Sequence, residues 1–223
     1  MTIGFRIERA PSRPSHDLVA AFRTVPTAIV SDNMNRMFAG GTALRPIHHS
    51  GILCGPALTV RTRPGDNLMV HKALDLAQPG DVIVVDAGGD TTNSIIGEIM
   101  WSYARTRGVA GFVIDGAVRD TAVLAAGDLP VYARGATHRG PYKDGPGEIN
   151  VTVSVGGMVV APGDIMLGDE DGLLVVPQAD APAILALARA QQEREGGILR
   201  SIADGTVDRS WVDRMLAERG LAP

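Results

Sequence analysis

Residues 80–120 read GDVIVVDAGGDTTNSIIGEIMWSYARTRGVAGFVIDGAVRD, and this stretch decides the class of fold. It contains two short, continuously apolar runs, VIVV and FVI, which are typical of strands buried on both faces of a sheet. We predict a strand at 81–86, a helix at 97–106 that Gly108 ends, and a second strand at 112–115. A strand, a crossover helix and a neighbouring strand in this order indicate an α/β fold.

The flanking segments add helices before this unit and strands after it. Ser15 and Asp66 are suited to cap the helices that follow them, and the Asp171-Gly172 pair is a hairpin-turn signal. Residues 137–147 are polar and rich in glycine and proline, which indicates a loop. We therefore expect an irregular arm at 1–14, helices at 15–22, 27–37, 67–77, 181–203 and 207–219, a short helix from Asp120, and strands at 55–62, 130–133, 149–155, 164–167 and 172–176.

Composition bounds the class of protein. The chain has 223 residues, of which 45% are hydrophobic, and we predict a single α/β domain over 1–223 with a mixed sheet and C-terminal helices over 180–223. The 21 Lys+Arg residues against 25 Asp+Glu give a net charge of −4, so we expect no nucleic-acid partner. Cys54 is the only cysteine, which excludes an internal disulfide and indicates a small buried side chain. Without a long apolar run or a signal-peptide core, we expect no membrane partner and a cytoplasmic location.

The densest chemical signal follows the two buried strands. Ligands of open α/β sheets bind beyond the carboxyl ends of the strands, and both ends carry polar residues here. The first amides of the helix at 97–106 are suited to bind a carboxylate, and the guanidinium of Arg119 offers a second anchor for one. Asp120 is a hard oxygen ligand for Mg²⁺ or Mn²⁺, and Glu98 could hold a water bound to that metal.

A plainer interpretation of the same residues stays open. An Arg-Asp pair at a strand end is often a surface ion pair and a helix cap. From the residues alone, a catalytic site and a structural ion pair are about equally well supported.

The stretch GEIMWSYARTRGVAGFVIDGAVRD, residues 97–120, resembles the signature of the RraA-like family. That signature is an acidic residue, twenty further residues and then Arg-Asp, here Glu98 followed by Arg119 and Asp120. The family includes 4-hydroxy-4-methyl-2-oxoglutarate / 4-carboxy-4-hydroxy-2-oxoadipate aldolases. The resemblance implies a layered β/β/α swivelling-type domain that assembles as a homo-oligomer, either a trimer or a hexamer.

The resemblance also implies a divalent-metal aldolase, using Mg²⁺ or Mn²⁺, that cleaves a 4-hydroxy-2-oxo acid to pyruvate and decarboxylates oxaloacetate. Carried over by position, the turn made by Gly97, Glu98, Ile99 and Met100 binds pyruvate. Arg119 contacts the substrate, Asp120 ligates the metal directly and Glu98 does so through water. Glu195, with Glu193 as the alternative, would approach the metal of a neighbouring subunit through water, although Gly196-Gly197 interrupts that helical stretch.

Three alternatives remain at this point. The loop at 135–150 does not match a characterised aldolase, so the enzyme could act on a different 2-oxo acid. The chain could instead be a non-catalytic regulator that binds a ribonuclease. A methyltransferase is disfavoured because the glycine turn lacks Gly-x-Gly spacing. We expect no Schiff-base chemistry, because Lys72 and Lys143 are the only lysines and neither falls in the motif.

Overall fold

The computed structural model describes residues 4–221 and contains one large mixed sheet and a separate hairpin. The strands of the large sheet run in the order β1-β8-β3-β4-β6-β7-β2, with β5 paired to β6 and the β11–β12 hairpin paired to β3. β9 and β10 form the separate hairpin. The strands are β1 Phe5–Ile7, β2 Arg45–Pro46, β3 Leu53–Thr62, β4 Val82–Asp86, β5 Ser94–Ile96, β6 Gly111–Val118, β7 Val131–Ala136, β8 Gly147–Ile149, β9 Val153–Val155, β10 Met158–Val160, β11 Ile165–Asp169 and β12 Gly172–Val176.

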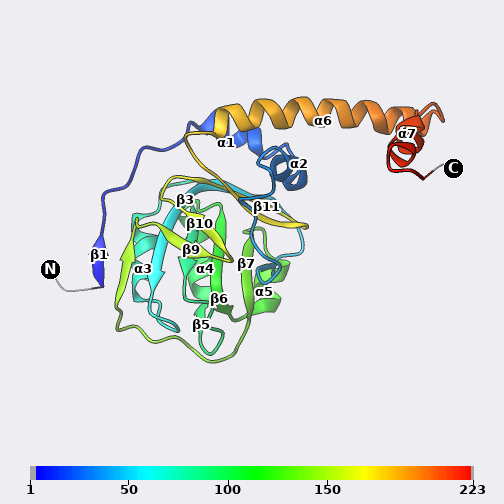
Figure 1. Ribbon diagram of the computed structural model, residues 1–223. Helices are drawn as coiled ribbons and strands as arrows, with labels where there is room; N and C mark the ends of the chain where they lie inside the picture. The colour runs from blue at the N-terminus through cyan, green and yellow to red at the C-terminus, as the bar shows by residue number, and fades with distance from the viewer. Residues whose placement is uncertain (1–3, 222–223) are drawn as a thin grey trace.

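The described residues contain seven helices (Figure 1). α1–α5 and the first part of α6 pack in layers against the strands, and α7 lies away from them at the far end of α6. α3, α4 and α5 pack on one face of the large sheet, and the β9–β10 hairpin covers the other face. α1, α2 and α6 pack against the β11–β12 hairpin. The predicted layered α/β fold with a mixed sheet and C-terminal helices is confirmed. The helices are α1 His16–Phe22, α2 Thr27–Asp32, α3 Leu68–Leu76, α4 Glu98–Thr106, α5 Thr121–Ala126, α6 Ala181–Ala203 and α7 Ser210–Glu218.

The central part of the sheet is parallel and positions the polar residues that follow it. β3 pairs in parallel with β4, β4 with β6, and β6 with β7. Asp86 on β4 lies opposite Asp115 on β6, so both strands end at the same edge. The continuous apolar runs predicted both strands, and their side chains are fully buried from Val82 to Val85 and from Phe112 to Ile114.

Two predicted elements are shorter than expected, for local backbone reasons. The helix predicted at 27–37 ends at Asp32, because Asn35 and Arg36 adopt left-handed backbone angles that an α-helix does not accept. The strand predicted at 149–155 is divided between β8 and β9 at Asn150, which is also left-handed.

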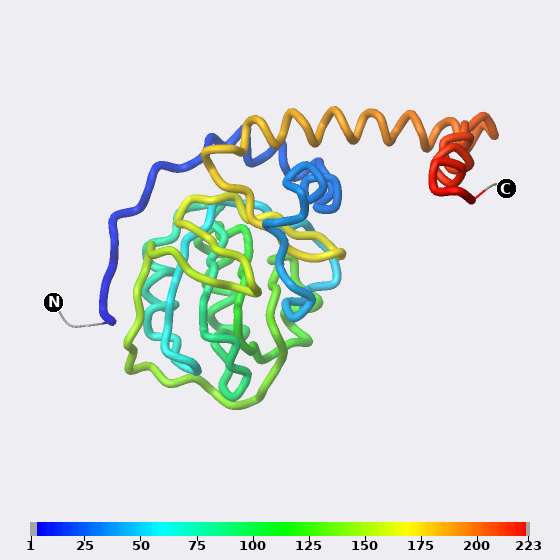
Figure 2. The backbone as a smooth tube through the Cα atoms, in the orientation of Figure 1, coloured from blue at the N-terminus to red at the C-terminus, as the bar shows by residue number. Residues whose placement is uncertain are grey.

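The arm at 1–14 is not wholly irregular. Within its described part, Phe5–Ile7 pairs in parallel with β8, and the chain then runs along the outside of the body to α1 (Figure 2).

The short strands β2, β5 and β10 are too brief to leave a periodic pattern, and sequence reasoning missed them. α6 runs without a break through Gly196 and Gly197, so these glycines do not interrupt the helix.

Cys54 is buried as predicted, and its thiol donates to the carbonyl oxygen of Val19 at 3.3 Å. Burial raises the pKa of this thiol to about 11, which keeps it protonated at neutral pH.

Within residues 4–221, no helix combines the length and apolarity that crossing a membrane requires.

Candidate active site

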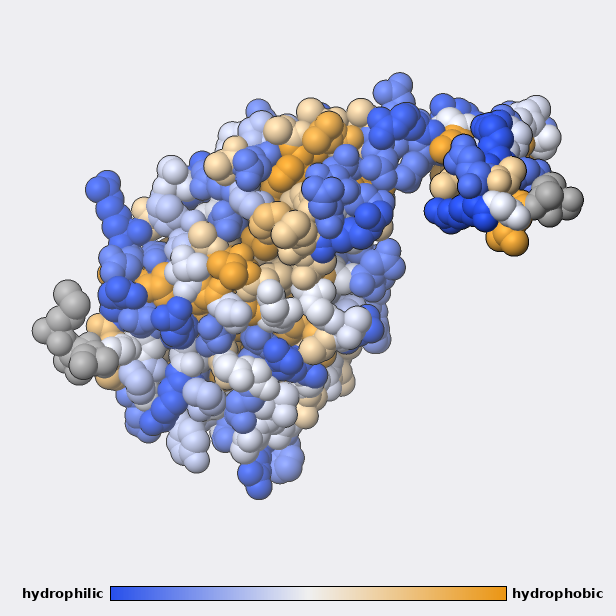
Figure 3. Space-filling model, in the orientation of Figure 1, coloured by the Kyte–Doolittle hydropathy of each residue, from blue (hydrophilic) through white to orange (hydrophobic). Residues whose placement is uncertain are grey.

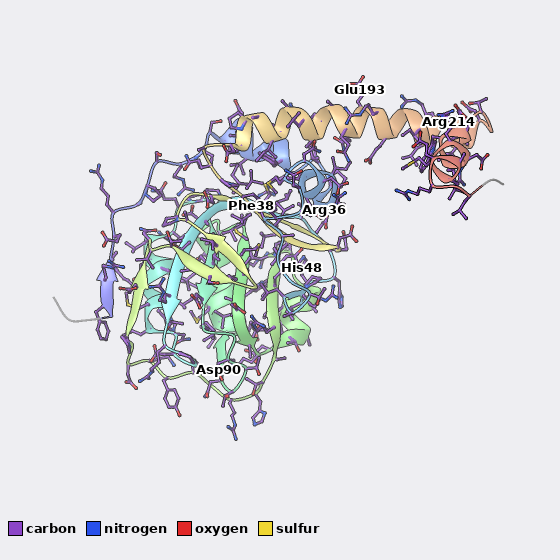
Figure 4. All side chains as sticks on the ribbon, in the orientation of Figure 1. Arg36, Phe38, His48, Asp90, Glu193 and Arg214 are labelled. Atoms are coloured by element: carbon purple, nitrogen blue, oxygen red, sulfur yellow. The ribbon has the colours of Figure 1, made fainter. Side chains whose placement is uncertain are left out.

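The candidate site lies beyond the carboxyl ends of β4 and β6. Figure 4 places Asp90, which follows β4, at the opposite end of the body from α6 and its Glu193. The chain leaves β6 at Val118 and passes directly into Arg119 and Asp120. The amide of Arg119 donates to the carbonyl oxygen of Ile96 at 3.0 Å, which brings the end of β6 beside the start of α4. The two halves of the motif, 20 residues apart in the sequence, therefore meet.

Gly97 allows this meeting because it has no side chain. A Cβ atom at this position would lie 2.5 Å from Oδ2 of Asp120 and 2.8 Å from Cγ of Arg119. Gly97 is the N-cap of α4 and has extended backbone angles, so its role is steric and does not depend on glycine's left-handed freedom. The glycine provides the space in which the carboxylate and the guanidinium lie over the start of the helix.

The start of α4 presents backbone amides to this space. The Glu98 amide donates to Oδ2 of Asp120 at 2.9 Å, and Trp101 is the first amide that bonds back into the helix. The amides of Ile99 and Met100 belong to the first turn, where no intrahelical acceptor exists. The amides of Ile99 and Met100 are therefore suited to bind a carboxylate, as expected. The Glu98 amide, of which the same was expected, instead orients Asp120.

Asp120 adopts a left-handed backbone conformation with φ 55° at the N-cap of α5. This conformation is unfavourable for a residue with a Cβ, and such residues are often found at functional sites. Nε of Arg119 lies 3.6 Å from Oδ2 of Asp120, with both side chains about 40% exposed. The carboxylate is thus fixed on one oxygen by an amide while it stays accessible to a ligand from the cavity.

Two cavities meet at Arg119. The larger has a volume of about 720 Å³ and opens between α4, α5 and the segment after β7. It is lined by Glu98, Arg119, Asp120, Thr121, Ala122, Val123, Ala136, Thr137 and His138. The smaller has a volume of about 170 Å³ and is more enclosed. It is lined by Asn67, His71, Ser94, Ile95, Ile96, Gly97, Ile99, Met100, Arg119, Pro141 and Lys143.

The smaller cavity corrects the expectation about the lysines. Lys143 falls outside the motif in sequence but lines this cavity together with Arg119 and Met100. A Cβ at Gly140 would lie 3.4 Å from Nη1 of Arg119, so the loop backbone passes beside the guanidinium. Sequence reasoning missed this approach because the loop carries no periodic signal and returns to the site through tertiary contacts.

Asp66 holds this loop in place. Its fully buried carboxylate accepts hydrogen bonds from the amides of Leu68, Asp144 and Gly145 at 2.8–2.9 Å. Nη2 of Arg63 lies 3.1 Å from Oδ2 of the same carboxylate. Asp66 thus accepts from the first amide of α3 and also fixes the loop that carries Lys143. α3 begins at Leu68, one residue later than expected.

We expect Asp66→Ala to lower the free energy of unfolding by about 3–5 kcal/mol, because three amides and a guanidinium lose their acceptor. Urea denaturation followed by circular dichroism measures this change. Asp75→Ala is the matched control: Asp75 lies on α3 with an exposed carboxylate 3.6 Å from Lys72, so its loss should cost less than about 1 kcal/mol. Equal losses in the two variants would contradict the assigned role of Asp66.

His71 contributes a neutral side chain to the smaller cavity. Partial burial and the nearby Lys143 ammonium both lower the pKa of His71, with a smaller opposing effect from Asp75. The imidazole is therefore mainly uncharged at neutral pH, and Lys143 and Arg119 supply the positive charge of this cavity. This charge favours an anionic ligand.

A divalent metal fits the oxygen chemistry of the larger cavity. Asp120 supplies a carboxylate, and Glu98 follows the start of α4 on the same wall. Among residues 4–221, no group of three or more His, Cys, Asp or Glu side chains is arranged to hold a metal. Mg²⁺ commonly binds through one or two carboxylates and keeps several waters, so such a group is not required.

Glu195 lies away from this site in the same chain. Its Oε1 accepts a hydrogen bond from Nε2 of Gln191 at 2.8 Å, and Gln191 in turn contacts Asn33 after α2. Glu193 points away from the body of the protein (Figure 4). Neither glutamate lines either cavity, so a role for one of them requires a second subunit.

Asp86 and Asp90 make structural hydrogen bonds. Asp86 accepts from the amide of Gly88 at 3.1 Å, and Asp90 accepts from the hydroxyl of Thr92 at 2.8 Å. These bonds shape the glycine turn beside the site.

Comparison with known proteins decides the family. The family model described as RraA-like, Aldolase/RraA, matches residues 27–175. This chain belongs to the Aldolase/RraA family. Members at this distance include a protein of Halalkalibacterium halodurans that is named "Putative 4-hydroxy-4-methyl-2-oxoglutarate aldolase". It is 38% identical over 206 residues, which cover 92% of this chain and 98% of the relative.

Solved structures share the Aldolase/RraA architecture. A protein of Pseudomonas syringae pv. tomato described as uncharacterized superposes with a TM-score of 0.80 at 26% identity, covering 88% of this chain and 97% of that one. Streptomyces coelicolor RraAS2, described as an unusual member of the RNase ES inhibitor RraA family, gives a TM-score of 0.76 at 27% identity. That match covers 83% of this chain and 97% of RraAS2.

Proposed function

We propose that this member of the Aldolase/RraA family is a divalent-metal-dependent lyase that cleaves a 4-hydroxy-2-oxo acid to pyruvate. We extend the proposal to the decarboxylation of oxaloacetate, which leaves the same three-carbon product. The observation that carries it is the close packing of Arg119 and Asp120 over Gly97 at the start of α4. The name of the 38% identical relative supports the same reaction class.

The chain's own residues have distinct tasks in this reaction. The amides of Ile99 and Met100 bind the substrate carboxylate, since first-turn amides point at such an anion. Arg119 donates to the keto oxygen, where negative charge grows as the C3–C4 bond breaks. The 4-hydroxyl loses its proton as C4 becomes a carbonyl, and a proton then adds to C3 to give pyruvate. Glu98 orients the water that carries these protons.

Asp120 would hold the divalent cation, with Glu98 acting through water. When bound, the cation supplies Lewis-acid stabilisation of the negative charge on the keto oxygen. Asp120 is suited to this task because the Glu98 amide occupies one oxygen and orients the carboxylate towards the cavity.

Release of pyruvate, coupled to lactate dehydrogenase, tests the proposal. The substrates are 4-hydroxy-4-methyl-2-oxoglutarate and oxaloacetate, each with Mg²⁺ or Mn²⁺ and with EDTA as the control. We expect turnover that requires the metal. A lack of turnover on both compounds would argue for a different 2-oxo acid or for a non-catalytic role.

The position of Lys143 makes a second test necessary. An amine beside the 2-oxo acid could form a Schiff base, which borohydride would reduce to a stable adduct. We expect no adduct in the mass spectrum after incubation with pyruvate and borohydride. An adduct at Lys143 would overturn the metal-dependent reaction in favour of Schiff-base catalysis.

We also propose that the protein forms a homo-oligomer, a trimer or a hexamer. α6 projects beyond the body and carries α7 at its far end (Figure 2), and both bear exposed apolar side chains. Figure 3 shows hydrophobic residues at the surface near the base of α6 and again at the far end of this projection. A second copy would cover them. The exposed large apolar residues of α6 and α7 are Leu187, Ile198, Leu199, Ile202, Trp211, Met215 and Leu216, and Leu221 follows α7.

In this assembly Glu195 would reach the site of a neighbouring subunit, with Glu193 as the alternative. We expect Glu195→Ala and Asp120→Ala to be nearly inactive separately. Dissociating and reassembling them together should restore part of the activity, because some sites then combine an intact Asp120 with an intact Glu195. Reassembled mixtures with no more activity than the separate variants would contradict the shared site.

A regulator of ribonuclease activity is the second candidate, and the description of RraAS2 favours it. Such a protein acts through its surface and does not need a glycine beneath Arg119 and Asp120. Inhibition of a ribonuclease that persists in Arg119→Ala would support this candidate as an additional role.

A further inference from the structure

The two cavities that meet at Arg119 differ in size and in lining. The smaller, about 170 Å³, lies below the range of about 300–1,000 Å³ typical of pockets for drug-sized ligands. The larger, about 720 Å³, lies well within it. A substrate that uses both would place a small head group in the first cavity and its remaining atoms in the second.

The lining identifies which end of the substrate each cavity accepts. Ile99 and Met100, whose amides are suited to bind a carboxylate, line only the smaller cavity, where Lys143 and Arg119 add positive charge. The three-carbon head of a 2-oxo acid therefore belongs there. The half of the substrate that leaves on cleavage then lies in the larger cavity. This division rests on the proposed function.

The larger cavity offers few groups to bind a second carboxylate. Glu98 and Asp120 belong to the wall that would hold the cation, and Thr121 directly follows Asp120 on that wall. Arg119 also lines the smaller cavity, where the head group binds. The hydroxyl of Thr137 is already used, donating to the carbonyl oxygen of Thr92 and accepting from the amide of Arg139. The imidazole of His138 has no hydrogen-bond or ion-pair partner among residues 4–221, so it is available to donate.

The backbone on both sides of His138 is fixed. On one side, the amide of Thr137 donates to the carbonyl oxygen of Val118 at 3.0 Å. On the other side, the carbonyl oxygen of Arg139 accepts from both the amide and the hydroxyl of Ser94 at 2.9 Å. The backbone of His138 is thus held at the cavity wall before substrate binds.

We propose that His138 binds the distal carboxylate of the substrate and thereby selects 4-hydroxy-2-oxo acids that carry one. His138 does not take part in bond cleavage. Its imidazole donates a hydrogen bond to the carboxylate of the leaving half, from a different segment of the lining than those that carry Glu98 and Asp120.

His138→Ala and His138→Gln test this role through three rates. The first is cleavage of 4-hydroxy-4-methyl-2-oxoglutarate, which has a distal carboxylate. The second is cleavage of the five-carbon 4-hydroxy-2-oxo acid that ends in a methyl group instead. The third is the exchange of pyruvate methyl protons with D₂O, followed by NMR, which needs only the head group. His49→Ala, at an exposed histidine before β3, is the matched control.

We expect His138→Ala to lower kcat/KM for the dicarboxylic substrate by about 10–100-fold, the effect of losing one hydrogen bond to a charged group. The other two rates should change by less than about 3-fold, and His138→Gln should recover part of the loss because its amide can still donate. An equal fall in all three rates, or no change in the first, would overturn the assignment to His138. An unaltered protein that neither cleaves nor exchanges would overturn the proposed function, and this inference with it.

Discussion

Replacing Arg119 with alanine should lower the rate of pyruvate release by about 100–1,000-fold. The guanidinium is the one cationic side chain that lines both cavities, so its loss removes a donor to the keto oxygen as charge develops there. The same assay that measures pyruvate release gives the rate constants. We expect kcat to fall more than KM rises, because the interaction strengthens in the transition state.

The control for this variant is Arg6→Ala. Arg6 lies on β1, half-exposed, and pairs with Glu8 and Glu148 far from the cavities in the sheet order. Its loss should change the rate by less than about 2-fold, as expected of a surface ion pair. A residual rate in Arg119→Ala above about one tenth of the original would contradict the catalytic role of Arg119.

Gly97→Ala should lower the rate of pyruvate release nearly as much as Arg119→Ala does, although it removes no functional group. The added methyl would lie 2.5 Å from Oδ2 of Asp120 and 2.8 Å from Cγ of Arg119, so both side chains must move. Displacement of catalytic groups by about 1 Å can cost about 100-fold in rate. The overpacking itself costs only about 1–3 kcal/mol, so the protein should stay folded.

Gly135→Ala is the matched control for this crowding. Gly135 lies on β7 near the larger cavity, and a Cβ there would meet only Cγ2 of Thr91 at 3.9 Å, an ordinary contact. We expect nearly unchanged activity and a nearly unchanged melting temperature. Full activity in Gly97→Ala would show that Arg119 and Asp120 need not lie where the structure has them.

The motif residues were predictable from the sequence because short-range patterns specify them. Two continuous apolar runs fixed the neighbouring strands β4 and β6, and parallel pairing then brought their polar ends together. The resemblance of the motif, Glu98 followed by Arg119 and Asp120, indicated which of these polar residues to expect at the site. The left-handed Asp120 and the bond from the Glu98 amide to its carboxylate were not predictable, because they depend on how β6 and α4 meet.

The sequence linked the loop after β7 to the choice of substrate, but the contacts that hold this loop at the site were not predictable. Lys143 and His138 reach the cavities because buried Asp66 holds the amides of Asp144 and Gly145, and because Ser94 holds Arg139. These contacts join residues about 45–80 positions apart in the chain, and no local pattern reports them. Lys143 lies outside the motif in the sequence and lines the smaller cavity for the same reason.

The most direct test of the central claim is a titration of the protein with Mn²⁺, followed by electron paramagnetic resonance, with and without pyruvate. We expect one site per chain whose affinity for Mn²⁺ rises about 10-fold when pyruvate is present, since both ligands share one site. We also expect Asp120→Asn, which keeps the shape of the side chain and an acceptor for the Glu98 amide, to abolish Mn²⁺ binding. Unchanged Mn²⁺ binding in Asp120→Asn would show that Asp120 does not hold the cation.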